Sequence, residues 1–300
     1  MLLGGGAALA AVTARRFARD DAEAHARLGA VPRSVATTDF GDLEYADVGD
    51  GEPLLAVHGI FGGRDAGLWS FGKLVPGRRV VAPSRFGYLG STLPAYATPA
   101  MQADAFAKLL DTLGIDQLDV VAFSAGTPSA LQLALRHPAR VRHLVVMSGA
   151  WPGAFSKAPL PVEKLAYKSD LLMWLVTRLA GSAFFRLAAG LPKDFPLAGE
   201  DEAKVRALVD SVFPVRERSP GVIFDAFVGN PDVDTYPLED VTVPTLVVHS
   251  RDDTLARFQP AEVAASRIPQ AELVSFDSGG HLMLGREPAT QAAVRAFLSS

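Results

Sequence analysis

The chain has 300 residues, which suffices for one large domain or two modest ones with a substantial buried core. A hydrophobic fraction of 49% and a charged fraction of 21% are ordinary for a globular protein, and a formal charge of −4 gives no electrostatic reason to expect a nucleic-acid partner. The absence of cysteine excludes disulfides, thiolate catalysis and cysteine-based metal sites.

The N-terminal segment, residues 1–14, carries no charge and is followed by Arg15 and Arg16. A secretory signal would begin with a basic region, and a spanning helix would need about 20 apolar residues, so the segment matches neither pattern. We expect residues 1–32 to form an N-terminal apolar or helical extension of a cytoplasmic protein. Membrane association or export through this segment is the alternative, with membrane contact only through residues 1–14.

From residue 33 onward, predicted strands alternate with predicted helices. Two short antiparallel strands come first, and residues 54–57 and 79–82 are continuous apolar runs of the kind that lie buried on both faces of a sheet. Apolar side chains at helical spacing predict a helix at residues 99–113, and a further helix is predicted at residues 288–298. This alternation predicts an α/β fold with a mainly parallel sheet and helices on both faces. The predicted strands are residues 33–38, 42–47, 54–57, 79–82, 118–123, 144–147, 245–249 and 272–276.

An insertion at residues 151–240 interrupts the alternation. It shows no obvious strand and several helical stretches, which predicts a helical cap over the strand ends. The core would then consist of a first part at residues 33–150 and a second part at residues 241–300. The predicted cap helices are residues 162–180, 183–189, 201–213 and 222–228.

The clearest motif lies where the strand at residues 118–123 ends at Ser124. Small residues flank this serine, and Pro128 and a helix-favouring segment follow at once. The order of strand, sharp turn and helix predicts a nucleophile elbow, which holds the serine hydroxyl clear of the sheet. The pattern G-x-S-x-G has one departure, Ala122 in place of its first glycine, and alanine is the mildest replacement available.

A serine hydroxyl needs a base within hydrogen-bond reach, and the base needs an acid that fixes its tautomer. His281 follows two glycines directly after the last predicted strand and is the candidate base. Asp253, in the loop after the strand at residues 245–249, is the candidate acid, with Asp252 as the alternative. We expect the other histidines to be structural or exposed, and His249 to pack against the acid loop.

A glycine-rich segment from His58 to Gly63 follows the first buried strand. Its glycines would let backbone amides approach a substrate closely. The expected oxyanion-hole donors are the backbone N–H groups of Ala125 and Ile60, with Phe61 as the alternative to Ile60. The side chain of His58 is expected to brace this loop.

These motifs resemble a capped, esterase-like serine hydrolase of the α/β-hydrolase fold across residues 34–300. The resemblance rests on H-G-I-F-G-G at the oxyanion loop, A-F-S-A-G at the elbow, H-S-R-D-D at the acid loop and G-G-H at the base, in the family's order of Ser, Asp and His. The segment around Arg85 resembles the Arg-Gly loop of many members, and we expect an ordinary turn there. The resemblance implies a catalytic triad of Ser124, Asp253 and His281 that acts through an acyl-enzyme on Ser124.

The substrate does not follow from the fold, because function lies in the pocket. The cap is rich in aromatic residues, most of which should pack the cap, while those facing the serine favour an apolar substrate. We predict cleavage of a small-molecule apolar carboxylic ester. The alternatives are a C–C bond hydrolase, an amidase, a lactonase or a perhydrolase with the same triad, or a non-catalytic ligand-binding member of the fold. No metal or cofactor motif occurs, and we expect neither. The aromatic residues are Trp151, Phe155, Trp174, Phe184, Phe185, Phe213, Phe224 and Phe227.

Overall fold

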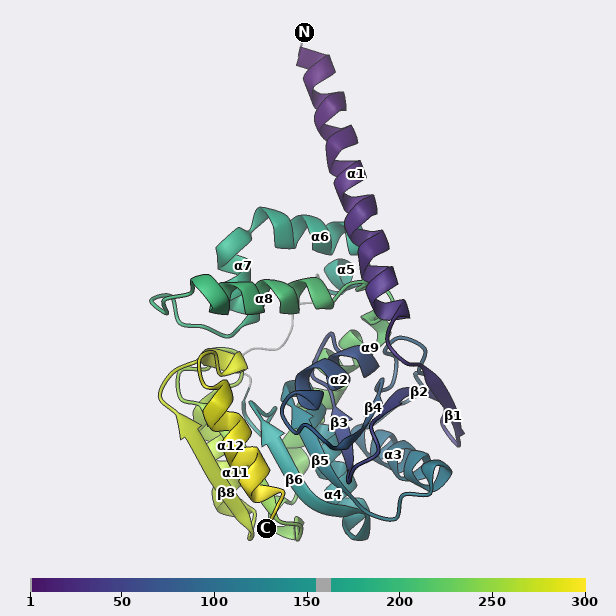
Figure 1. Ribbon diagram of the computed structural model, residues 1–300, viewed down its shortest axis with the longest axis vertical. Coiled ribbons are helices and arrows are strands. Elements are labelled where there is room, and N and C mark those ends of the chain that lie inside the picture. Colours follow the sequence, from purple (N-terminus) through teal and green to yellow (C-terminus); the bar gives the residue numbers. More distant parts are fainter. Residues whose placement is uncertain (1, 155–162) are drawn as a thin grey trace.

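One eight-stranded sheet forms the centre of the computed structural model, which describes residues 2–154 and 163–300 (Figure 1). The strand order is β1-β2-β4-β3-β5-β6-β7-β8. β1 pairs with β2 and β2 with β4 in antiparallel fashion, and the remaining described pairs are parallel, so the predicted mainly parallel sheet is confirmed. The strands are β1 (Ser34–Thr38), β2 (Gly41–Val48), β3 (Pro53–Val57), β4 (Arg79–Pro83), β5 (Leu118–Phe123), β6 (Val141–Met147), β7 (Thr245–Ser250) and β8 (Ala271–Phe276).

Helices cover both faces of this sheet, and successive side chains of the central strands point to opposite faces. In β3, Leu55 and Val57 belong to the core on one face, whereas Leu54 and Ala56 belong to the core on the other. Because both faces are covered, the central strands are apolar at nearly every position instead of alternating. The first face is covered by α3 (Pro99–Leu113), α4 (Thr127–Arg136) and α11 (Phe258–Arg267), and the second by α2 (Arg64–Gly72) and α12 (Glu287–Phe297).

The helix α3 shows how local sequence sets the limits of an element. The Thr98 side chain accepts a hydrogen bond from the Met101 N–H, and Pro99 occupies the first turn, where a missing N–H costs nothing. Gly114 ends the helix in the left-handed conformation, with φ of 63°. These limits are those that the sequence predicts.

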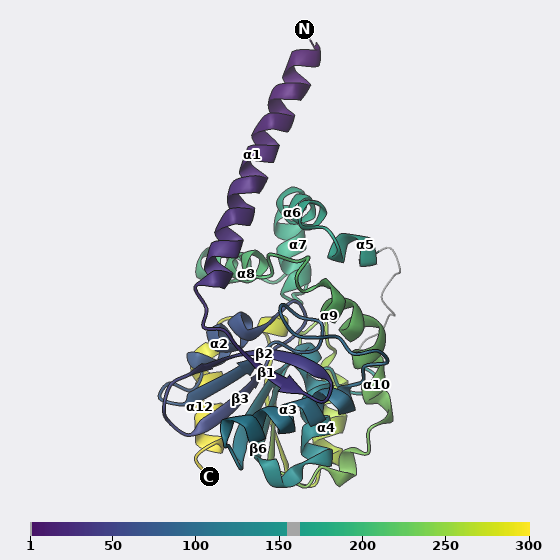
Figure 2. The same cartoon turned by 90° about the vertical axis from the view of Figure 1, so that its right-hand side faces the viewer.

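The described part of the insertion after β6 is helical. Its helices between Asp170 and Ser211 lie above the core, whereas the segment from Asp225 to Asp232 runs down beside the sheet (Figures 1 and 2). Phe224 and Val233 of this later part belong to the core on the first face. The prediction of one helix at residues 162–180 is wrong, because α5 ends at Tyr167 and the Ser169 side chain caps a second helix by accepting from the Leu172 N–H. Residues 155–162, including Phe155, lie outside the described residues. The helices of this region are α5 (Glu163–Tyr167), α6 (Asp170–Leu179), α7 (Gly181–Ala188), α8 (Gly199–Ser211), α9 (Ser219–Phe224), a π-helical turn (Asp225–Gly229) and α10 (Asn230–Asp232).

The N-terminal helix α1 (Leu2–Gly29) projects away from the rest of the molecule (Figures 1 and 2). Its second half packs on the cap. Ala24 lies in one apolar cluster with Trp174 and Phe213, and the Phe17 ring meets the Trp174 ring edge to face at 5.8 Å. Among the described residues no single helix is long and apolar enough to cross a membrane, and only α6 and α7 together reach that length and composition, with a bend of 109° between them.

Candidate active site

The turn between β5 and α4 holds Ser124 in a left-handed backbone conformation, with φ of 50°. Residues other than glycine rarely adopt this conformation, and strain of this kind is concentrated at functional sites. The turn is tight because the chain passes close to β3: a Cβ at Gly126 would come 2.6 Å from the Val57 carbonyl oxygen. Ala122, which replaces the first glycine of the elbow pattern, is fully buried in the sheet.

Three side chains from three loops form one hydrogen-bonded chain. His281 Nε2 lies 2.8 Å from Ser124 Oγ, and His281 Nδ1 lies 2.7 Å from Asp253 Oδ2. All three residues are buried. Because an ionised carboxylate only accepts hydrogen bonds, Nδ1 carries the proton and Nε2 accepts from the serine hydroxyl. The structure therefore brings together the three residues that the sequence predicts as nucleophile, base and acid.

The Asp253 carboxylate is held in its ionised form by its neighbours. Its Oδ1 accepts from the backbone N–H groups of Leu255 and Ala256 at 2.8 and 3.0 Å. Burial raises the pKa of Asp253, but His281 and His249 lower it by more, so this pKa lies well below its usual range. His249 packs against the acid loop as expected, with Nε2 2.9 Å from the Ala256 carbonyl oxygen and 3.3 Å from Asp253 Oδ2.

The other candidate acid, Asp252, has a different place in the structure. Its two carboxylate oxygens accept from the backbone N–H groups of Gly279 and Gly280, at 3.2 and 2.8 Å. Asp252 thus ties the acid loop to the loop that carries His281. The geometry favours Asp253 as the partner of the base.

The cap contributes a contact to the base that the sequence does not predict. The Ala189 carbonyl oxygen accepts from the His281 N–H at 2.9 Å, and the Gly190 carbonyl oxygen accepts from the Thr254 N–H at 3.0 Å. On the core side, the Ser148 hydroxyl donates to the His281 carbonyl oxygen at 2.7 Å. The backbone of His281 is therefore fixed by both the cap and the core.

The oxyanion loop, residues 58–63, lies beside the serine: a Cβ at Gly59 would come 3.3 Å from Ser124 Cβ. The Gly59 carbonyl oxygen accepts from His58 Nδ1 at 2.7 Å and from the Gly62 N–H at 3.2 Å. In a trans peptide the C=O and N–H groups point in opposite directions, so the Ile60 N–H faces away from these donors. The alternative donor, Phe61, has φ of 59°, and its ring packs edge to face on Tyr167 of the cap at 5.3 Å.

The second predicted donor is oriented in the same way. The Ser124 carbonyl oxygen accepts from Thr127 Oγ1 at 2.6 Å and from the Ala150 N–H at 3.2 Å, so the Ala125 N–H points to the opposite side of that peptide. His58 braces the loop: its Nε2 accepts from the Arg85 N–H at 3.0 Å. Burial and the Arg85 charge lower the pKa of His58 well below its usual value, which fits a neutral ring that accepts at Nε2.

Within residues 2–154 and 163–300, no three His, Asp or Glu side chains gather where they could hold a metal ion.

Known proteins resemble this chain over most of its length. A family model described as alpha/beta hydrolase fold matches residues 52–288. An uncharacterized hydrolase of Bacillus subtilis is 29% identical over 88% of this chain and 97% of its own length. A 2-hydroxymuconate semialdehyde hydrolase of Pseudomonas putida is 30% identical over 78% of this chain and 82% of its own length. The solved structure of an α/β-hydrolase fold protein from Nakamurella multipartita is 29% identical, with a TM-score of 0.75, and covers 89% of this chain and 99% of that one.

The chain therefore belongs to the α/β-hydrolase fold family, and it is a hydrolase of that family.

Proposed function

We propose that this protein is a serine hydrolase that cleaves an apolar carboxylic ester through an acyl-enzyme on Ser124. The observation that carries the proposal is the chain of hydrogen bonds from Ser124 through His281 to Asp253. A serine hydroxyl becomes a competent nucleophile when such a base accepts its proton.

The geometry supports a reaction in two steps. His281 takes the Ser124 proton as Oγ attacks the ester carbonyl, and the ionised Asp253 stabilises the imidazolium that forms. The N–H groups of Ile60 and Ala125 stabilise the negative charge on the carbonyl oxygen. His281 then gives its proton to the leaving alkoxide, which leaves an acyl-enzyme. Water repeats the sequence with the same base and releases the acid and Ser124.

The surroundings of the base support an uncharged, apolar substrate. The Phe123 ring lies edge to face on the His281 ring at 5.1 Å, and the buried Leu191 reaches the adjoining Gly280, where a Cβ would come 2.6 Å from its Cδ2. The two buried arginines that contact the oxyanion loop, Arg85 and Arg218, are both paired with carboxylates. They are therefore neutralised without a substrate carboxylate.

A second candidate is hydrolysis of a C–C bond. The similarity to a 2-hydroxymuconate semialdehyde hydrolase favours it, since the same triad type could serve that reaction. A muconate derivative carries a carboxylate that needs a cationic partner, and both arginines at the oxyanion loop are engaged, so we rank this candidate below the ester. We rank amide hydrolysis, lactone hydrolysis and perhydrolysis below ester and C–C bond hydrolysis.

The first experiment is labelling with a fluorophosphonate, followed by peptide mass spectrometry. We expect an adduct on Ser124 that disappears in His281→Ala, because labelling requires an activated serine. A panel of p-nitrophenyl esters of increasing acyl length and a 2-hydroxy-6-oxo-dienoate then separates the two candidates. Faster turnover of the dienoate would reverse their order. A correctly folded protein that gives no adduct and no turnover would overturn the proposed function.

A further inference from the structure

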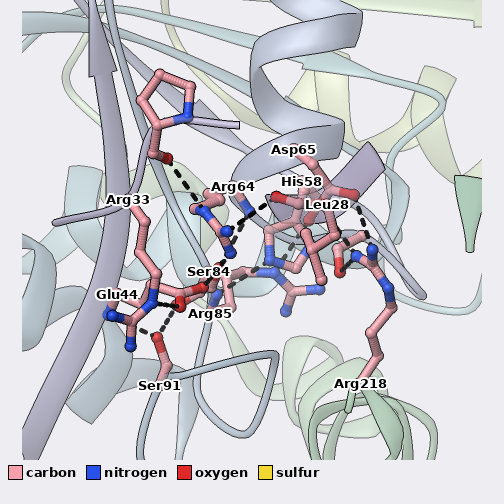
Figure 3. Close-up of polar contacts among 12 residues, drawn as sticks. Leu28, Arg33, Glu44, His58, Arg64, Asp65, Ser84, Arg85, Ser91 and Arg218 are labelled. Atoms are coloured by element: carbon pink, nitrogen blue, oxygen red, sulfur yellow. Dashed lines mark hydrogen bonds and ion pairs between the residues drawn. The ribbon is translucent and has the colours of Figure 1, made fainter. Parts of the chain in front are cut away.

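Two buried arginines donate hydrogen bonds to carbonyl groups at opposite ends of the oxyanion loop (Figure 3). Arg85 follows β4, and its Nε–H donates to the His58 carbonyl oxygen at 3.0 Å. Arg218 directly precedes α9, and its Nη1–H donates to the Gly62 carbonyl oxygen at 2.6 Å. Both ends of the loop are thus fixed by side chains from outside it.

Each arginine is oriented by a carboxylate. Arg85 Nη1 and Nη2 lie 2.6 and 2.5 Å from the two oxygens of Asp225, which also accepts from the Tyr88 hydroxyl. Arg218 makes a similar forked pair with Asp65, in the first turn of α2, at 3.0 and 2.7 Å. Burial raises the pKa of Asp65, but the charge and hydrogen bonds of Arg218, together with the Ala66 N–H and the Arg64 charge, lower it by more, so the pKa lies below its usual value. A forked pair fixes the direction of the guanidinium as well as its charge.

The backbone around Arg218 is bound to the loop that follows β4. The Leu89 N–H donates to the Glu217 carbonyl oxygen at 2.8 Å, and the Gly221 N–H donates to the Gly87 carbonyl oxygen at 2.9 Å. Arg218 itself is fully buried. This part of the cap is therefore hydrogen-bonded directly to the core.

The contact of Arg218 bears on the Ile60 N–H through a short turn. The Gly62 N–H donates to the Gly59 carbonyl oxygen and closes a turn that contains Ile60 and Phe61. Arg218 donates to the carbonyl oxygen of this same Gly62, so both polar backbone groups of Gly62 are hydrogen-bonded. Without that bond the Gly62 carbonyl group would lose the side chain that fixes its direction, and glycine, the least restricted residue, opposes rotation of this peptide the least. The turn would then lose its fixed end, and the direction of the Ile60 N–H would vary.

We propose that Arg218 is a positioning residue for the oxyanion hole, which acts through the Gly62 carbonyl group and does not itself touch the reacting atoms. The inference rests on the proposed function, because a reaction that develops an oxyanion is what uses this hole. A hydrogen-bond donor is effective there only if its direction is fixed before the reaction. Stability alone is a weak reason for the pair, because apolar side chains of similar volume often stabilise a fold as well as a buried ion pair does.

The test compares Arg218→Met with Arg64→Met. Arg64 is a matched control: it is also a buried arginine with a carboxylate partner, Glu44 at 2.7 Å, but its other side-chain bonds go to the carbonyl oxygens of Pro32 and Leu28 (Figure 3). On an ester that the wild type hydrolyses, Arg218→Met should lower kcat about 10- to 100-fold and leave KM within about threefold. In Arg64→Met, kcat should stay within about threefold of the wild type.

Affinity for a boronic acid, which forms a tetrahedral adduct with the serine, should fall in Arg218→Met by the same factor as kcat. Arg218→Lys covers the case in which the methionine variant does not fold. Lysine keeps the positive charge beside Asp65, but its single ammonium group lacks the planar guanidinium that binds Asp65 and the Gly62 carbonyl oxygen together. The kcat of Arg218→Lys should therefore lie between those of the wild type and Arg218→Met. Wild-type kcat in both folded Arg218 variants would overturn the inference and leave the proposed function intact.

Hydrogen exchange decides the inference independently of activity. Deuterium uptake by peptides that span residues 58–63 should rise in Arg218→Met and stay at the wild-type level in Arg64→Met. If the wild type neither labels nor hydrolyses any ester, the proposed function fails, and uptake still decides whether Arg218 orders the loop. Equal uptake in the wild type and Arg218→Met would overturn the inference whatever the activity.

Discussion

Gly190 of the cap lies directly against His281 of the core. A Cβ at Gly190 would come 2.7 Å from His281 Cβ and 2.9 Å from Asp253 Oδ1. The backbone of Gly190 is in the left-handed region, with φ of 59°. The cap therefore contacts the base and the acid at a point where no side chain fits, and the position of the cap and the geometry of the triad depend on each other.

Gly190→Ala should lower kcat about 10- to 100-fold, because the added methyl group displaces His281 or Asp253 and spoils their alignment. Gly181→Ala is a matched control in the same cap, since its φ is 51° but a Cβ there would have no neighbour within 4 Å. Left-handed strain should cost each variant about 1 kcal/mol of stability, and Gly190→Ala should lose more than Gly181→Ala because its methyl group is also overpacked. Steady-state kinetics and denaturant unfolding check both expectations. Equal kcat in the two variants would show that the contact with His281 does not matter.

Ser124→Ala should lower kcat by about 10³- to 10⁶-fold while the fold is retained. Ser129→Ala is the control, because Ser129 is another buried serine, in α4, whose hydroxyl donates to the Gly126 carbonyl oxygen at 3.3 Å. Its kcat should stay near the wild-type value. The measurement is ester turnover together with fluorophosphonate labelling. Near-normal turnover by Ser124→Ala would mean that another residue is the nucleophile.

The loops that carry the candidate triad could be predicted because each has a local signature. The strand, small-residue turn and helix around Ser124 follow one another in the chain, and the glycines before His281 mark a loop at a strand end. Gly190 and Arg218 could not be predicted, because they lie in a segment without a motif. Arg218 is 156 residues from its partner Gly62, so only the folded chain brings them together.

Physical reasons also explain why the sequence does not predict the helix α2 or the break between α5 and α6. The helix α2 contains Gly67 and ends at Gly72, and glycine lowers helix propensity by about 1 kcal/mol, so local sequence is a weak guide there. The break between α5 and α6 depends on Ser169 acting as a cap, a choice that serine makes only in a particular backbone setting. The roles of the five predicted site residues in catalysis stay predictions.

The stability contributed by His25 should depend on pH. His25 lies in α1 with its ring 3.6 Å from the Asp21 carboxylate and 3.3 Å from that of Glu217. Its hydrogen bond to the Asp21 carbonyl oxygen and these two carboxylates raise the pKa of His25. A raised pKa in the folded state gives stability that is complete below the unfolded pKa of about 6.5 and is lost as the pH rises through the higher folded pKa.

The melting temperature of the wild type should therefore exceed that of His25→Gln by more at about pH 5.5 than at about pH 9. Added salt should reduce the difference, because the ring is partly exposed. A difference that grows toward alkaline pH would contradict the assigned direction of the pKa shift.

Replacing Asp253 or Asp252 by asparagine tests which of the two carboxylates is the catalytic acid and which only connects the acid loop to the loop of His281. Asp253→Asn should lower kcat about 10⁴-fold, because an amide next to Nδ1 no longer selects the tautomer in which Nε2 accepts from Ser124. In Asp252→Asn one acceptor oxygen remains for the N–H groups of Gly279 and Gly280, so we expect a loss of no more than about tenfold. The measurement is kcat at saturating ester, with circular dichroism to establish folding. A larger loss in Asp252→Asn would mean that the acid is Asp252. Since the pKa of Asp253 lies well below its usual range, any loss of wild-type activity between about pH 7 and pH 5 must come from the protonation of another group.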